Sequence, residues 1–263
     1  MGKPKFYDFC VHAVPDGENT VEDLAYLAYH FGYSGIAVAN HSDKPLKVRT
    51  LPRAIEGLEV FKGVVVVEEN PSKLQGMVRK FRSNTDVLIV HGGSEAVNRI
   101  AVENPAVDIL SHLSFEKSSG FNHVLAKAAA ENGVALGVDL RSLLHSRGQR
   151  RIRLLSDLRV NLDLARKYDV NLILLSDAMS CFDLRAPREM LAMAEVCGFE
   201  ETEALEALST VPEAIFKKNR TFGNVLEGVE VFKEEDLKEK DLQEDAFKES
   251  ALKREDFKGD DFV

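Results

Sequence analysis

The stretch Gly63-Val64-Val65-Val66-Val67-Glu68 sets the fold class, because four valines in a row stand between a glycine and a carboxylate. β-Branched side chains favour extended backbone. A strand that is apolar on both faces is typical of a parallel sheet that is covered on both sides. A helix is expected directly after it, over residues 71–82, with Pro71 near its start. This strand–helix order is the repeating unit of an α/β fold.

The same order repeats along most of the chain. Further strands are expected at Lys5–His12, Ser34–Asn40, Asp86–His91, Val107–Ser111, Val134–Asp139 and Asn171–Ser176. Helices are expected at Thr20–Phe31 (with Thr20 as N-cap), in a short segment around Leu51–Gly57, at Ser94–Glu103, Gly120–Asn132, Ile152–Lys167, Pro187–Cys197 and roughly 201–219. No GxGxxG or GxxxxGK[ST] phosphate loop follows the first strand. A doubly wound sheet and a barrel are both compatible with this repeat.

Polar or ionisable side chains follow nearly every expected strand. They are His12, Asn40, His41, Glu68, His91, Ser111, His112, Asp139, Ser176 and Asp177. In a parallel barrel these strand ends meet at one rim, where function usually lies. We therefore predict an α/β fold, a TIM-like barrel of about seven to eight βα units.

The net charge of -9 over 263 residues is concentrated at the C-terminal end of the chain. Residues 227–263 carry 14 acidic and 7 basic side chains, which leaves residues 1–226 at only -2. We predict a barrel domain over 1–226 and an acidic tail over 227–263. Such a tail is typical of a solvated extension with little fixed structure, and an acidic interaction arm is the alternative.

Composition also limits where the chain acts. No run of apolar residues is long enough to cross a membrane. The first five residues lack the apolar core of a signal peptide, so a cytoplasmic location is expected. Cys10, Cys181 and Cys197 form no CxxC pair, and we interpret them as reduced thiols.

The order of the rim residues resembles the PHP phosphoesterase barrel, which is a metal-dependent family. The matching positions are Cys10, His12, His41, Glu68, His112 (a looser match) and Asp177. Two positions depart from the family pattern, because Cys10 and Met179 stand where that family has histidines. A thioether is a poor ligand for the hard ions of phosphoryl chemistry. We therefore expect no metal cluster and a rim whose residues hydrogen-bond one another. A stand-alone PHP-type metal-dependent phosphoesterase is the alternative.

A second constellation is basic. Between Leu140 and Ser156 no acidic residue occurs, and the arginines are Arg141, Arg147, Arg150, Arg151 and Arg153. Guanidinium groups gathered in this way fit phosphate, although a solvated loop is the plain alternative. On the helix that begins near Phe121, we expect Val124, Leu125 and Ala128 to be buried, and His123 and Lys127 to share the exposed face.

Three stretches resemble the family of archaeal ribonuclease P protein component 3, the counterpart of the thirty-kilodalton subunit of eukaryotic RNase P and RNase MRP. They are Gly120–Lys127 (GFNHVLAK), Asn132–His145 (NGVALGVDLRSLLH) and Asp183–Glu189 (DLRAPRE). The likeness covers roughly residues 4–219. It implies a PHP-like barrel within the ribonucleoprotein that removes the 5′ leader from precursor tRNA. It also implies that RNA and its Mg²⁺ ions perform catalysis, with no catalytic residue and no cofactor in this chain.

The resemblance further implies the partners. These are RNase P RNA, precursor tRNA, other RNase P proteins and a small RRM-like subunit that pairs with this chain as a two-plus-two heterotetramer. Matching the family's basic positions and adding the basic constellation gives the expected RNA-binding residues: Lys44, Arg99, His123, Lys127, Arg141, Arg147, Arg150, Arg151, Arg185 and Arg188. We expect them to contact phosphate and sugar, which sets position on the RNA and adds a salt-dependent part to the affinity.

Overall fold

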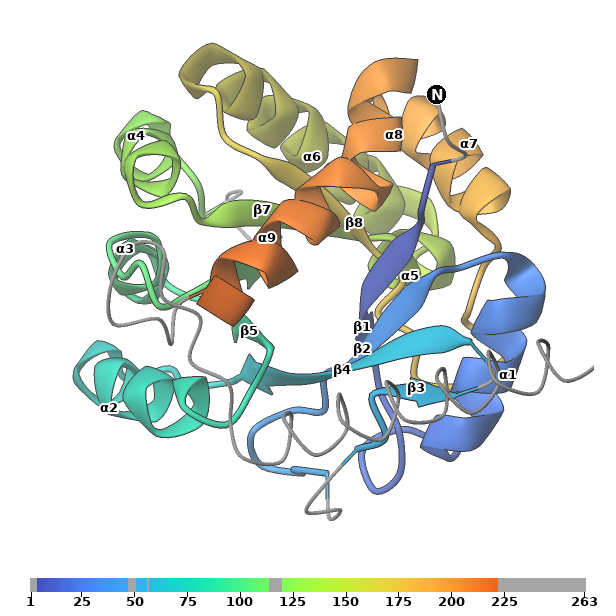
Figure 1. Ribbon diagram of the computed structural model, residues 1–263. Helices are drawn as coiled ribbons and strands as arrows, with labels where there is room; N and C mark the ends of the chain where they lie inside the picture. The colour runs from blue at the N-terminus through green and yellow to red at the C-terminus, as the bar shows by residue number, and fades with distance from the viewer. Residues whose placement is uncertain (1–3, 47–50, 56, 114–119, 222–263) are drawn as a thin grey trace, which may run out of the picture. The chain divides into compact units, whose positions relative to one another are not determined.

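The computed structural model describes residues 4–46, 51–55, 57–113 and 120–221. Within this part, seven parallel strands form a barrel surrounded by helices (Figure 1). The predicted barrel is therefore confirmed. The predicted tail, residues 227–263, lies outside the described residues. A compact unit of the chain ends at Asn219.

The strands neighbour one another in the order β1-β2-β4-β5-β6-β7-β8. Their bounds are Tyr7–Val11 (β1), Gly35–Val38 (β2), Leu58–Val66 (β4), Val87–His91 (β5), Ile109–Ser111 (β6), Ala135–Asp139 (β7) and Leu172–Leu175 (β8). A parallel bridge between Val11 and Ala178 brings the last strand back to the first. The N–H of His12 donates to the Ala178 carbonyl at 2.8 Å, and the Ala178 N–H donates to the Cys10 carbonyl at 3.3 Å. The sheet thus closes on itself just beyond β8.

The prediction of a short helix around Leu51–Gly57 is wrong. The described residues there form strand β3, Ala54–Ile55, which runs antiparallel to the start of β4. Pairing with β4 overrides a weak helical pattern in so short a segment, because strand preference depends on neighbours more than on the residues themselves.

Helices fill the other connections. Their bounds are Val21–Phe31 (α1), Pro71–Arg82 (α2), Glu95–Val102 (α3), His123–Asn132 (α4), Leu140–His145 (α5), Gly148–Tyr168 (α6), Pro187–Cys197 (α7), Glu201–Leu208 (α8) and Thr210–Thr221 (α9). The capping box of Thr20 and Asp23 before α1 is confirmed. The sequence did not predict α5, which begins because the Asp139 carboxylate accepts the Ser142 N–H at 3.0 Å. No helix in the described ranges combines the length and the apolar character that a membrane crossing requires.

One detail of α4 differs from the expected pattern. Its buried residues are Leu125, Ala126 and Ala129, whereas Val124 is 45% exposed. The buried face of α4, which begins at His123, is therefore shifted by one residue from the predicted face. His123 and Lys127 are both exposed, as predicted.

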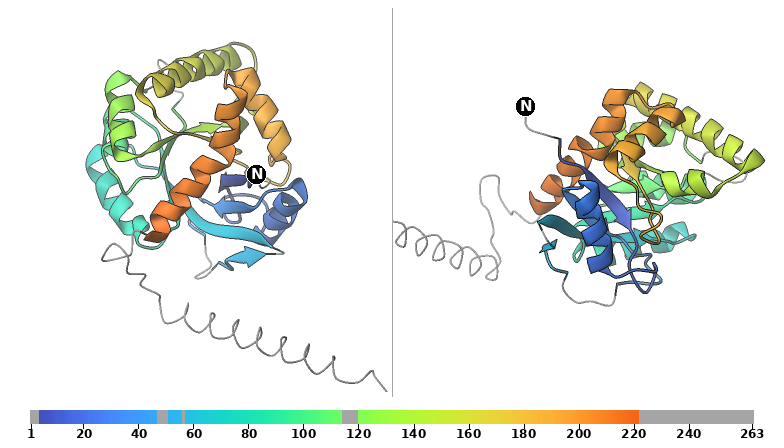
Figure 2. Two further views of the ribbon diagram at one scale, coloured as in Figure 1. Left: turned by 45° about the horizontal axis from the view of Figure 1, so that its top comes forward. Right: turned by 90° about the vertical axis from the view of Figure 1, so that its right-hand side faces the viewer.

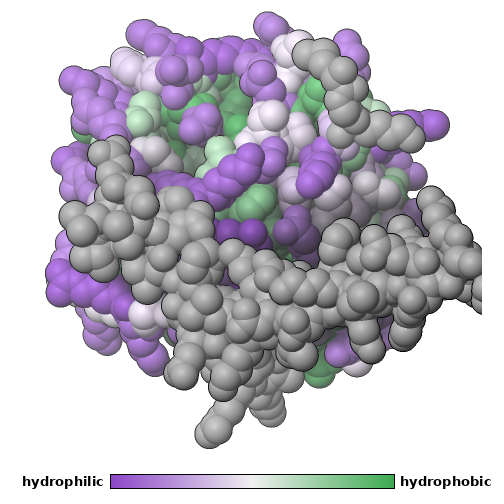
Figure 3. All heavy atoms as spheres, viewed as in Figure 1, coloured by the Kyte–Doolittle hydropathy of each residue, from purple (hydrophilic) through white to green (hydrophobic). Residues whose placement is uncertain are grey.

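Helix α9 covers the end of the barrel where the strands begin (Figures 1 and 2). Ile215 and Phe216 pack with the aromatic side chains inside the barrel, among them Tyr7 and Phe61. The Asn219 amide donates to the Asp86 carbonyl, directly before β5, at 2.8 Å. With that end closed, the polar strand ends gather at the opposite end of the barrel. Figure 3 shows this face, and its visible part carries hydrophobic residues among hydrophilic ones.

Candidate functional site at the polar rim of the barrel

The centre of the rim is a contact between the first and the last strands. His12 follows β1 and is fully buried, and its Nε2 lies 3.0 Å from Oδ1 of Asp177, which follows β8. Cys10 lies inside the barrel, in the same buried cluster as Tyr7 and Phe9, where the register of β1 shifts between Asp8 and Val11. Its Sγ lies 3.5 Å from His12 Nε2 and 3.8 Å from Asp177 Oδ1.

Asp16 contacts two histidines of this cluster, His12 and His41, through its carboxylate. Its Oδ2 lies 3.0 Å from His12 Nδ1 and 2.7 Å from His41 Nδ1, and it accepts the His41 N–H at 2.9 Å. Lys44 Nζ lies 3.5 Å from the other carboxylate oxygen. Sequence reasoning missed Asp16 because it lies in a loop and not directly after a strand. Its position four residues after His12 was the available signal.

His112 enters the rim from the end of β6. Its Nδ1 lies 3.3 Å from Asp139 Oδ2, and its Nε2 lies 3.5 Å from Asp177 Oδ1. The Nε2 atom is buried and has no hydrogen-bond partner of good geometry among the described residues. His112 and Asp177 both have positive φ values, 56° and 55°, which is costly for residues other than glycine. The ring of His91 stacks on His112 at 4.4 Å between centroids.

The electrostatics follow from burial and from these contacts. Burial alone would raise the pKa of Asp177, but the close contacts of its carboxylate with the His112 and His12 rings hold that pKa well below its usual range. Burial opposes the charged form of His12, yet its hydrogen bonds with Asp16 and Asp177 raise its pKa. Burial raises the pKa of the Cys10 thiol well above its usual value, and the Asp177 charge acts in the same direction.

Glu68 does not join the rim as the resemblance to PHP enzymes implied. Its Oε1 accepts the Asn70 N–H at 2.9 Å, in the turn before α2. Within the described chain, the groups of donor atoms close enough to hold a metal ion are Cys10 with His12 and Asp177, His12 with Asp16 and His41, and His112 with Asp139 and Asp177. The prediction that rim residues hydrogen-bond one another holds for His12 with Asp177, whereas His41 hydrogen-bonds Asp16, which was not among the predicted rim residues.

Some of the basic residues proposed for RNA binding lie beside this rim. Arg141, on α5, has Nη1 at 3.9 Å from Asp177 Oδ2 and Nε at 3.5 Å from Asp183 Oδ2. His145 shares Asp183, with Nε2 at 2.9 Å from Oδ1. Arg185 donates to the carbonyls of Phe182 and Leu184 at 2.6 and 2.9 Å. These contacts orient the two guanidinium groups, and Asp183 is a further residue that the sequence reasoning did not single out.

The arginines at the start of α6 are more exposed. Arg147 stands at the N-cap position, and Arg150 lies in the first turn. Neither has an ion pair with a carboxylate in the described part of the chain, and the same holds for Arg188 in the first turn of α7. Arg151 donates to the Leu144 carbonyl at 3.2 Å. Positive charge without a paired carboxylate is available for phosphate.

Arg99, His123 and Lys127 form a separate group on α3 and α4, which lie side by side across the barrel from α7 (Figure 1). Arg99 lies 3.4 Å from Glu95, and Lys127 lies 3.8 Å from Glu131, both as exposed pairs one helical turn apart. Exposed pairs of this kind are weak and exchange easily for another anion. The predicted RNA-binding residues therefore fall on two faces of the barrel.

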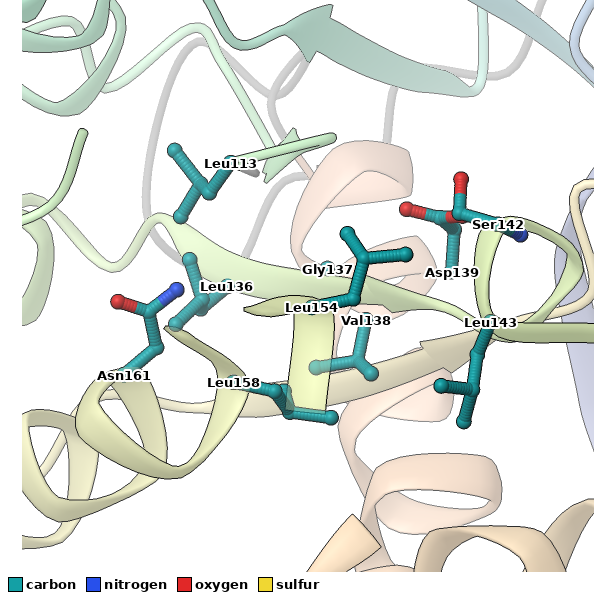
Figure 4. A pocket seen from close by; sticks show the side chains of 10 residues that line it. All are labelled: Leu113, Leu136, Gly137, Val138, Asp139, Ser142, Leu143, Leu154, Leu158 and Asn161. Atoms are coloured by element: carbon teal, nitrogen blue, oxygen red, sulfur yellow. The ribbon is translucent and has the colours of Figure 1, made fainter. Parts of the chain in front are cut away.

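Two cavities flank α5 and α6. The first, lined by Asp139 and Ser142 at one end and Asn161 at the other, has a volume of about 50 Å³ (Figure 4). The second is an open groove of about 350 Å³ between α5, α6 and α7, with a lining of Leu143, Leu144, Arg151, Leu155, Ala192, Met193 and Val196. An exposed groove that is nearly all apolar is of the kind that a protein partner covers.

Comparison with known proteins shows the family. Residues 5–222 match the family described as RNase P subunit p30. The Ribonuclease P protein component 3 of Methanosarcina mazei is 71% identical over 239 residues, which cover 90% of this chain and 100% of the relative. That of Methanosarcina acetivorans is 68% identical over 238 residues, which again cover 90% and 100%.

The fold comparison agrees. A chain from a cryo-EM structure of archaeal Ribonuclease P with mature tRNA superimposes with a TM-score of 0.73 and 29% identity. The match covers 87% of this chain and 99% of that chain. The resemblance noted in the sequence is thus confirmed over nearly the whole barrel, and the chain belongs to the RNase P subunit p30 family.

Proposed function

We propose that this chain is a protein subunit of ribonuclease P and supports the catalytic RNA that removes the 5′ leader from precursor tRNA. The observation that carries the proposal is the match over residues 5–222, together with the likeness to a chain of an RNase P structure with tRNA. Catalysis belongs to the RNA with its Mg²⁺ ions, and the chain contributes no catalytic group.

RNA contact uses two basic faces. The first face comprises Arg141, Arg147, Arg150, Arg151, Arg185 and Arg188, with Lys44 at the rim. The second comprises Arg99, His123 and Lys127. Arg147, Arg150 and Arg188, which have no ion pair with a carboxylate among the described residues, bind phosphate through charge and two-pronged hydrogen bonds. The two faces thus position the RNA without reading its sequence. The shape of the folded RNA supplies the specificity.

The protein partner is a small RRM-like subunit, in a two-plus-two assembly. The apolar groove between α5, α6 and α7 supports a protein partner, because its lining is nearly free of polar groups. Its closeness to the first basic face would let partner and RNA bind next to each other. Other RNase P proteins complete the particle, in the cytoplasm.

Reconstitution tests the proposal. RNase P RNA and the small partner subunit are assayed for cleavage of precursor tRNA at low Mg²⁺, with and without the full chain. We expect cleavage to require the chain, and we expect the chain alone to cleave nothing. Cleavage that is independent of the chain would reject the proposal. Hydrolysis of a phosphodiester by the isolated chain with Mn²⁺ would favour a metal-dependent phosphoesterase instead.

A further inference from the structure

The first half of helix α6 is packed less closely against the barrel than the second half. The buried residues of α6 are Asn161, Leu162 and Ala165, and all three belong to the second half. None of residues 148–160 is buried, and Ile152 is 60% exposed. Helices in proteins owe most of their stability to the packing of an apolar face. The apolar side chains of the first half are therefore available to another molecule.

The apolar groove between α5, α6 and α7 opens along this half of α6. Leu155 forms part of its α6 wall, and Met193 and Val196 form part of its α7 wall. Val196 is 73% exposed. Covering these side chains with a second apolar surface would be favourable, because it removes them from water.

A guanidinium group stands at each end of the groove. Arg151 and Arg159 are eight positions apart on α6, which is about 12 Å along the helix axis. Arg151 donates to the Leu144 carbonyl, on α5, at 3.2 Å. At the other end, a Cβ added to Gly198, directly after α7, would lie 3.8 Å from Cγ of Arg159.

These positive charges are not balanced locally. Neither Arg151 nor Arg159 has an ion pair with a carboxylate among the residues that the structure describes, and no acidic residue of that part of the chain lines the groove. An occupant with carboxylates near both ends would therefore complement the groove in charge as well as in polarity.

The combination favours a protein helix over RNA. Phosphate and sugar would satisfy the two arginines but would leave Leu155, Met193 and Val196 in contact with water or polar groups. A helix with apolar side chains at positions i, i+3 or i+4, and i+7 lays a continuous apolar stripe into such a groove. Carboxylates about two turns apart on the same helix would reach both guanidinium groups.

We propose that this groove binds an amphipathic helix of the small partner subunit, with an apolar stripe between two acidic ends. The proposal rests on the proposed function, which supplies the partner, and adds where and by what chemistry the partner binds. Arg151 has five N–H donors and can hold a partner carboxylate and a phosphate together. Arg147, Arg150 and Arg188 remain available to RNA.

Binding of the purified small subunit to the full chain, measured by calorimetry without RNA, tests the apolar contact. Val196→Asp should weaken binding by about 100-fold or more, because the new carboxylate is buried in the complex without a partner. The matched control is Val160→Asp. Val160 is 49% exposed and lies five positions after Leu155, on another side of α6, so this variant should bind as wild type does.

A charge reversal tests the acidic ends of the occupant. Arg159→Glu should weaken binding of the small subunit by about 10-fold, since it places like charges together. Arg159 is not among the residues expected to bind RNA. RNase P RNA alone should bind the Val196→Asp and Val160→Asp chains equally, because both variants add the same charge to the same region.

Hydrogen exchange on the wild-type chain gives a readout that needs no variant. Addition of the small subunit should slow amide exchange in residues 148–160 of α6 and in α7. In α3 and α4, across the barrel, exchange should not change. This measurement stays decisive even if a variant fails to fold.

Three outcomes would overturn the proposal. They are equal affinity of Val196→Asp and Val160→Asp for the small subunit, no protection of α6 and α7, and RNA binding that Val196→Asp weakens while binding of the small subunit is unchanged. The last would assign the groove to RNA. If cleavage of precursor tRNA still requires the chain in such a case, the proposed function stands and only the groove is misassigned. Cleavage that does not require the chain would reject the proposed function itself.

Discussion

Arg82 Nη1 lies 2.6 Å from Asp108 Oδ2, and this pair joins the end of α2 to the loop before β6. Asp108 is buried, and the same carboxylate oxygen accepts the Leu88 N–H at 2.8 Å. Arg82 also donates to the carbonyls of Ala106 and Thr85. Although Arg82 belongs to a basic helix, its guanidinium group therefore has a structural role in the barrel.

Removing this guanidinium should destabilise the fold. Arg82→Ala leaves the Asp108 carboxylate buried without its partner, and we expect a loss of about 3 kcal/mol in the free energy of unfolding. Urea denaturation measures the change. Arg79→Ala is the control on the same helix, since Arg79 is exposed, and it should stay within about 0.5 kcal/mol of wild type. Equal effects of the two variants would contradict the structural role of Arg82.

The arginines at the start of α6 should act through RNA and not through stability. We expect the double variant Arg147→Ala/Arg150→Ala to bind RNase P RNA more weakly at every salt concentration. Each lost phosphate contact should flatten the plot of log affinity against log salt concentration by about 0.7–0.9. The control is Lys217→Ala, on α9 at the closed end of the barrel. A salt dependence that stays at the wild-type slope would show that these arginines do not touch phosphate.

The bidentate contact between Arg166 and Glu203 should make stability depend on pH. Arg166 Nε and Nη2 lie 2.8 and 2.6 Å from the two carboxylate oxygens and tie α6 to α8. These hydrogen bonds lower the pKa of Glu203. The stabilisation is therefore complete above the ordinary pKa of glutamate and is lost as the pH falls through the lowered value.

The measurement compares wild type with Glu203→Gln by urea denaturation from about pH 7 down to about pH 3. Because the pair is partly exposed, we expect a difference of about 0.5–1 kcal/mol near neutrality that shrinks towards acid pH. Glu201→Gln, at an exposed position in the same helical turn, should show no such trend. A difference that grows on acidification would mean that the ionised Glu203 carboxylate does not stabilise the folded chain.

The packing of Phe216, on α9, against aromatic rings inside the barrel should be needed for a stable fold. Phe216 lies 5.2 Å from Phe61 and 5.9 Å from Tyr7 between ring centroids. Phe216→Ala opens a cavity at the closed end and should cost about 3–5 kcal/mol, measured as a lower Tm and a lower free energy of unfolding. Phe182→Ala removes a ring that is 87% exposed and should have little effect on stability. A Phe216→Ala protein as stable as wild type would show that α9 does not close the barrel.

The helix–strand pattern was predictable where the signal is local. Four consecutive valines in β4 and the Thr20 capping box each specify structure through neighbours in sequence. The short segment around Ala54 was misjudged because its partner, the start of β4, decides its conformation. In α4 the stripe was placed one position early, because periodicity locates a buried face less sharply than it identifies a helix.

The sequence by itself determined the barrel and the family, and it placed His12, His41, His112 and Asp177 at one rim, because parallel strands bring their carboxyl ends together. Only the tertiary structure decided which charges meet. Asp16 and Asp183 act from loops, Glu68 turns to the backbone of Asn70, and Arg82 is paired while Arg79 is exposed. The physical reason is the separation of the contacts along the sequence. Secondary structure depends on contacts within a few residues, whereas an ion pair such as His12 with Asp177 depends on how distant segments pack.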